Sequence, residues 1–148
     1  MKSFKRYTKI FFLIVLGIYL ISCAIPPMPH EVRYERVVNA DNQLANEKRE
    51  TAEEKIQLAD KLLSIISEYD DLLNERAMTN YAKTNIRNYK RQDTELVALL
   101  LFSAGQQYRN NGQIDKAKKV YQDIIRIFVG SAWAGYRDRA KMEIDNLK

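Results

Sequence analysis

After Asp41 the chain contains no proline, and glycine occurs there only at positions 105, 112, 130 and 135. Proline removes a backbone hydrogen bond from a helix, and glycine costs about 1 kcal/mol in a helix interior relative to alanine. A segment nearly free of both residues, with apolar side chains every three or four positions, is typical of long helices. We therefore expect an all-α fold over residues 41–148 of this 148-residue chain.

Residues 52–73 carry a clear helical pattern. Thr51 and Glu54 have the spacing of a capping box, which marks a helix start. The apolar stripe behind it is wider than a coiled-coil seam, so we favour packing within one chain over a helical dimer joined along this stripe. The stripe comprises Ala52, Ile56, Ala59, Leu63, Ile66 and Leu73, widened by Leu62, Ile65, Tyr69 and Leu72.

The pattern continues towards the C-terminus. Residues 75–91 predict another amphipathic helix, and Asp93 or Thr94 is a candidate cap for the next, from Glu95 towards Asn110. Gly130 and Ser131 predict a break before a final helix at about 132–147. Residues 31–41 are compatible with a short strand or with a helical lead-in.

The N-terminus has a different composition. Residues 1–22 contain four of the 24 Lys and Arg residues and no Asp or Glu, so without them the net charge falls from +5 to 20 − 19 = +1. The apolar run at residues 10–21 has 12 residues, whereas a membrane-spanning helix needs about 20. A basic start followed by a short apolar run is typical of a signal peptide, and an uncleaved anchor helix is the alternative.

Leu20, Ile21, Ser22 and Cys23, followed by Ala24, resemble the lipobox of bacterial lipoproteins. The resemblance implies cleavage before Cys23, a diacylglyceryl group on its sulfur and an acyl chain on its amine. Several acyl chains hold a protein on a membrane durably. Residues 1–22 would then be the signal peptide, 23–40 the lipidated cysteine with a proline-rich tether, and 41–148 the helical domain. Ala24 favours the outer membrane, with the domain facing the periplasm.

Residues 98–131 resemble one tetratricopeptide repeat, a helix–turn–helix unit of 34 residues. The match implies tetratricopeptide-like helical hairpins with a terminal capping helix that carries Trp133. Val129 departs from it, because the family usually has proline there. A single clear repeat is fewer than a solenoid needs, so the other helices must complete the stack. The matching positions are Leu101, Ala104, Gly105, Tyr108, Gly112, Ala117, Tyr121 and Ile124.

The resemblance also implies a partner-binding groove on the first helix of the repeat. Phe102 would supply an apolar contact and Arg109 a clamp for a carboxylate, unless Phe102 packs inside the domain and the polar residues only meet water. The groove positions are Leu99, Phe102, Gln106, Arg109 and Asn110. The expected partners are proteins or peptides of the cell envelope, with the membrane reached through the lipid.

Composition and motifs argue against other functions. One His and one Cys disfavour a metal cage, a His-dependent triad and an intrachain disulfide. No G-x-S-x-G, H-E-x-x-H or glycine-rich phosphate loop occurs. We expect a non-catalytic interaction scaffold or assembly factor, of the secretion, pilus or outer-membrane assembly type, without metal, cofactor or nucleic acid. A structural dimer or spacer and, further behind, a cell-wall enzyme are the alternatives.

Overall fold

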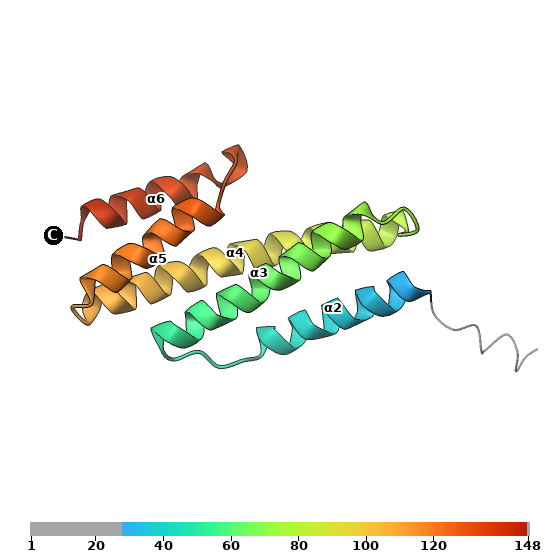
Figure 1. Cartoon of the computed structure of the whole chain (residues 1–148), viewed down its shortest axis with the longest axis horizontal. Helices are drawn as coiled ribbons and strands as arrows, with labels where there is room; N and C mark the ends of the chain where they lie inside the picture. The colour runs from blue at the N-terminus through green and yellow to red at the C-terminus, as the bar shows by residue number, and fades with distance from the viewer. Residues whose placement is uncertain (1–27, 148) are drawn as a thin grey trace, which may run out of the picture.

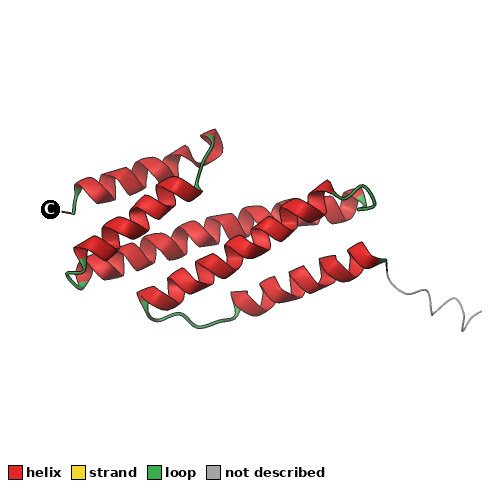
Figure 2. Ribbon diagram, in the orientation of Figure 1, coloured by secondary structure: helices red, strands yellow, loops and turns green. Residues whose placement is uncertain are grey.

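The structure, a computed structural model, describes residues 28–147 (Figure 1). The proposed signal peptide and the lipobox with Cys23 lie outside the described residues. The described part is all-α, without a strand, as Figure 2 shows. Its elements are α2 (Pro29–Ala45), α3 (Ala52–Asn74), α4 (Asn80–Asn110), α5 (Ile114–Ile127), a short 3₁₀ turn (Ser131–Trp133) and α6 (Ala134–Asp145).

Each helix packs mainly on its neighbours in the chain. The longest interface joins α3 to α4, and α5 lies against the C-terminal half of α4 (Figure 1). The outer helices extend this order, with α2 against α3 and α6 against α5. The all-α expectation for residues 41–148 is therefore confirmed for the part that the structure describes.

The start of α3 confirms the expected capping box. The Glu54 backbone N–H donates to the Thr51 hydroxyl at 3.2 Å, and the Glu54 carboxylate accepts from the Thr51 backbone N–H at 2.9 Å. These bonds satisfy donors that the first turn of a helix leaves without partners.

α2 settles the question left open for residues 31–41, which are helical. Pro29 occupies the first turn, where its fixed φ suits the helix and its missing N–H costs nothing. The residues expected to form the C-terminal part of the tether, 29–40, thus make up most of α2.

The expected helix boundary near residue 93 is wrong, because α4 runs without a break from Asn80 to Asn110. The helix continues through this stretch, and the Thr94 hydroxyl donates to the Lys90 carbonyl one turn earlier, at 2.6 Å. Asp93 is not a cap but a buried residue inside the helix, with Ile86 and Val97 on the same side.

Two apolar clusters hold the helices together. The smaller one joins α2 to the C-terminal half of α3 and the N-terminal half of α4 around Val37, Tyr69 and Ile86. The larger one joins the other halves of α3 and α4 to α5 and α6. Six residues chosen for the repeat motif are buried in the larger cluster, namely Leu101, Ala104, Tyr108, Ala117, Tyr121 and Ile124.

The two glycines of the motif have separate tasks. Gly112 ends the α4–α5 turn with φ +72°, a conformation that other residues rarely adopt. Gly105 faces the ring of Tyr121, and a Cβ on it would lie 2.6 Å from Cε1 of that ring.

Trp133, expected to cap the domain, is half-buried and stacks on Tyr136 with ring centres 5.8 Å apart.

Gly105→Ala should lower the free energy of unfolding by about 1–3 kcal/mol, because the added methyl group overpacks a ring that is only 1 % exposed. Gly135→Ala is the matched control: nothing lies within 4 Å of its added Cβ, and helix propensity should raise stability by up to about 1 kcal/mol. Urea unfolding followed by circular dichroism measures both. Equal stabilities of the two variants would contradict the close approach of α4 and α5.

Candidate functional site

The groove expected on α4 is partly covered by α6. Phe102 is 6 % exposed, so the expectation that it offers an apolar contact to a partner is wrong. Its ring packs near those of Tyr121 and Tyr136, with centres 6.1 and 6.4 Å away. The Arg139 guanidinium lies 4.5 Å from the Phe102 ring centre. Side chains of α5 and α6 therefore enclose it, which is the packing alternative considered from the sequence.

Arg109 is engaged as well, since its guanidinium forms an ion pair at 3.3 Å with Glu143 of α6. Leu99 is 60 % exposed, and Gln106 and Asn110 are also exposed. Four of the five expected groove residues are thus exposed, including Arg109, whose side chain is 42 % exposed, and together they form no hollow described in the structure.

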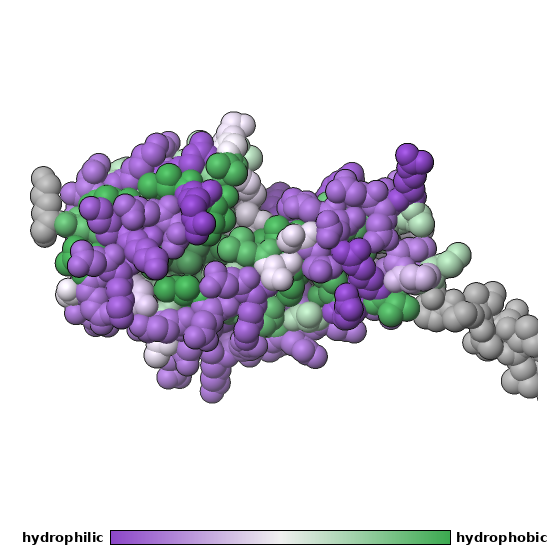
Figure 3. Space-filling view, viewed as in Figure 1, coloured by the Kyte–Doolittle hydropathy of each residue, from purple (hydrophilic) through white to green (hydrophobic). Residues whose placement is uncertain are grey.

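A different face of α4 is hollowed. Two neighbouring hollows of about 500 and 550 Å³ share Ile127. The first lies between α3 and α5 above α4, and the second lies between α3, the N-terminal half of α4 and the segment that follows α5; we call them together the α3–α5 groove. Hydrophobic residues gather between α3 and α5 in the space-filling view of Figure 3. Its apolar lining is Ile56, Leu63, Ile66, Leu73, Leu101, Val120, Ile127, Phe128, Val129 and Trp133.

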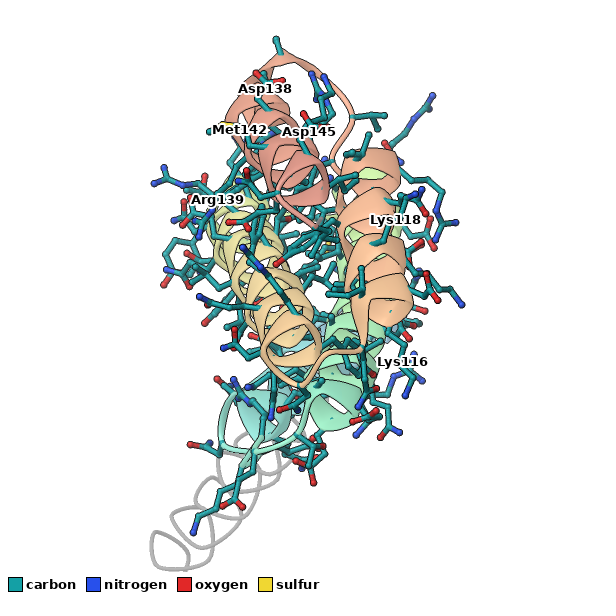
Figure 4. The ribbon with its side chains drawn as sticks, turned by 90° about the vertical axis from the view of Figure 1, so that its left-hand side faces the viewer. Lys116, Lys118, Asp138, Arg139, Met142 and Asp145 are labelled. Atoms are coloured by element: carbon teal, nitrogen blue, oxygen red, sulfur yellow. The ribbon has the colours of Figure 1, made fainter. Side chains whose placement is uncertain are left out.

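The rotation of about 100° per residue in an α-helix separates the hollowed face of α4 from the face expected to bind a partner. Leu101 of the groove stands two residues, and so about 200° of rotation, from Leu99 on the face expected from the sequence. In the end-on view of Figure 4, Arg139 and Lys116 lie on opposite sides of the molecule. Arg139 covers Phe102 on one side, and Lys116 lines the groove on the other.

Charged side chains surround the groove, with cations in excess. The lining contains Arg87, Lys90, Arg91, Lys116, Lys119 and Arg126 against Asp60, Asp70 and Asp123. Lys90 pairs with Asp70, and Arg126 pairs with Asp123 at 2.9 Å. Arg87 and Lys119 form no ion pair within residues 28–147.

One end of the groove is fixed by a polar contact between α3 and α4. The Tyr108 hydroxyl donates to the Glu53 carboxylate at 2.9 Å, and Lys116 lies 3.7 Å from the same carboxylate. The hydrogen bond from Tyr108 and the charge of Lys116 lower the pKa of Glu53 from its usual value. Glu53 therefore stays ionised and holds both partners in place.

A second unusual site lies beneath α2. Asp41 of α2 and Asp93 of α4 are 7 % and 5 % exposed, so two carboxyl groups share one buried environment. The Tyr69 hydroxyl of α3 and Oδ2 of Asp93 are buried there without a hydrogen-bond partner in the described part of the chain. Burial and the nearby Asp41 raise the pKa of Asp93 to about 7. Burial also raises the pKa of Tyr69, which stays a neutral hydroxyl.

This acid pair has one feature of a catalytic acid, a pKa near neutrality. It lacks another, because neither carboxyl lines any of the three described hollows where a substrate would sit. We interpret it as a structural pair that retains a proton, since two adjacent buried carboxyls resist ionising together. The sequence signal was Asp93 in phase with the apolar positions Ile86 and Val97.

No group of three or more His, Cys, Asp or Glu side chains within residues 28–147 is arranged to hold a metal ion. None of the helices that the structure describes has the length and apolar character needed to cross a membrane.

No protein family, no curated protein and no solved structure matches this chain.

The acid pair should make stability fall as pH rises. Asp93 has a higher pKa in the fold, about 7, than its ordinary value of 3.8, so the folded state binds more protons between these values. Each pH unit in that range then costs at most about 1.4 kcal/mol. Asp93→Asn should melt at a higher temperature than the wild type at pH 8, and the difference should shrink at pH 5.

Thermal unfolding from pH 5 to 8.5 measures this effect above the range in which exposed carboxylates titrate. Asp138→Asn is the matched control, because the Asp138 side chain is 68 % exposed and should leave the pH profile unchanged. A wild-type profile that is flat, or parallel to that of Asp93→Asn, would contradict a shared proton beneath α2.

Proposed function

We propose that this chain is a lipid-anchored lipoprotein of the bacterial cell envelope, and that its helical domain is a non-catalytic protein–protein interaction module. The observation that carries the proposal is the α3–α5 groove, an elongated surface whose apolar residues are flanked by charged side chains. Such grooves bind the apolar faces of partner helices. The lipobox resemblance at Cys23 supplies the anchor, and Ala24 favours the outer membrane facing the periplasm.

The internal packing supports a tetratricopeptide-like arrangement of the hairpins. In such repeats a small residue lets two antiparallel helices approach, and Gly105 facing Tyr121 has this role between α4 and α5. α6 then covers the end of the pair, as a capping helix does in a solenoid. An interaction scaffold or assembly factor fits this architecture.

The alternative of a structural dimer joined along residues 52–73 has less support. Leu58, Leu62 and Tyr69 on this helix are at most 2 % exposed, and α4 covers much of the stripe within one chain. Only its flank, with Leu63, Ile66 and Leu73, remains open in the groove. The same surface is available to a partner protein.

The anchor can be tested in a bacterial host fed an alkyne fatty acid. The full chain should be labelled, and mass spectrometry should find a mature N-terminus at Cys23. Cys23→Ser should abolish both results. The double variant Cys23→Ser with Ser64→Cys controls for reactivity of any cysteine and should stay unlabelled. An unlabelled wild-type chain that retains residues 1–22 would contradict the lipoprotein assignment.

The interaction role is tested by placing a photo-crosslinking amino acid in the full chain within the envelope. Val129, 72 % exposed, lies in the α3–α5 groove, and Leu99, 60 % exposed, lies on the opposite face of α4. We expect a discrete crosslinked protein from position 129 and none from position 99. Crosslinks from neither position would count against an interaction module.

A further inference from the structure

The α3 wall of the α3–α5 groove is long enough to lie along a short partner helix. Its α3 wall presents apolar side chains at three- to seven-residue spacing, from Ile56 through Leu63 and Ile66 to Leu73. Side chains in this pattern form a ridge that fits between those of another helix. The 18 residues from Ile56 to Leu73 rise about 25 Å, which is the length of a helix of about 18 residues.

The opposite wall and the floor have matching chemistry. Val120 and Ile127 of α5 face the groove, and Leu101 of α4 lies between the two flanking helices. Both α3 and α5 pack on α4. A helix laid between them would therefore contact apolar residues of three helices at once, which an extended peptide with alternating side chains would not match.

The charged side chains around the groove favour a partner segment with negative charge. Six cationic and three anionic side chains line the groove, an excess of three positive charges. They occupy both ends, with Arg87, Lys90 and Arg91 on α4 and Lys116 and Lys119 on α5. Arg87 and Lys119 are exposed and form no ion pair within the described residues, so both are available to a partner's carboxylates.

We propose that the α3–α5 groove binds an amphipathic helix of a partner protein that places apolar residues on the floor and Asp or Glu residues beside Arg87 and Lys119. This inference rests on the proposed interaction function and adds to it the conformation and charge of the partner segment. The apolar contacts provide affinity, and the rim charges provide orientation and discrimination.

The test uses the full chain in zwitterionic nanodiscs, with empty nanodiscs subtracted. The probe is a fluorescent 18-residue helical peptide with Leu or Ile at three- and four-residue spacing and Glu on both flanks. A second peptide replaces every Glu by Lys, and a third scrambles the apolar positions. Anisotropy should give binding of the acidic peptide at least tenfold tighter than that of either other peptide, and the difference should shrink at high salt.

Charge reversal in the protein gives the sharper comparison. Arg87→Glu with Lys119→Glu should weaken the acidic peptide about tenfold and strengthen the basic peptide. The control Arg76→Glu with Lys118→Glu makes the same change in net charge on side chains outside the groove lining and should leave both affinities within twofold. Circular dichroism checks that all variants are folded.

A groove variant that binds both peptides as the wild type does would overturn the inference, and so would equal binding of the acidic and basic peptides. Either result leaves the interaction function standing if position 129 or position 99 still crosslinks a partner in the envelope. Absence of crosslinks at both positions removes the interaction function itself, so the two failures are distinguishable.

Discussion

The burial of one side of α4 from Ile86 to Tyr108 is the constraint on which the rest of the structure depends. Both apolar clusters include side chains of this helix, Ile86 in one and Leu101 in the other. α3 and α5 pack on it directly, whereas α2 and α6 reach it mainly through them. α3 likewise runs unbroken through both clusters, with Leu62 in one and Tyr69 in the other. The two unbroken helices make the two halves of the domain one unit, and α4 fixes the separation of α3 and α5 that creates the groove.

The same constraint explains why Asp93 has an unusual environment. Because α4 is continuous, Asp93 lies within its packed region, at the point that α2 covers. The carboxyl there meets Asp41 instead of solvent, and burial raises its pKa. Arg33 stabilises α2 differently, through ion pairs at 2.8 Å with Glu68 and Glu75 of α3. α2 is thus held by surface charge pairs on α3 and by a protonated pair beneath.

Local signals in the sequence predicted much of the fold. The capping box at Thr51, the turn at Gly112 and the contact of Gly105 with the second hairpin helix each depend on residues close together in the chain. The boundary at Asp93 failed because an acidic residue in an apolar phase has two explanations, a cap or a buried site, and only tertiary packing chooses between them. The predicted position of the groove was wrong for a related reason. The side of α4 that remains open depends on where α6 folds, and no local pattern around Phe102 encodes that position.

The order of packing has a consequence for how the domain forms. Every substantial interface joins helices that are neighbours in the sequence, so the loops that join packed helices are short and the entropy lost in closing them is small. Helical proteins with such local contacts fold within microseconds to milliseconds. A chain that enters its compartment N-terminus first can therefore assemble one helix on the previous one as each emerges, without waiting for its last residue.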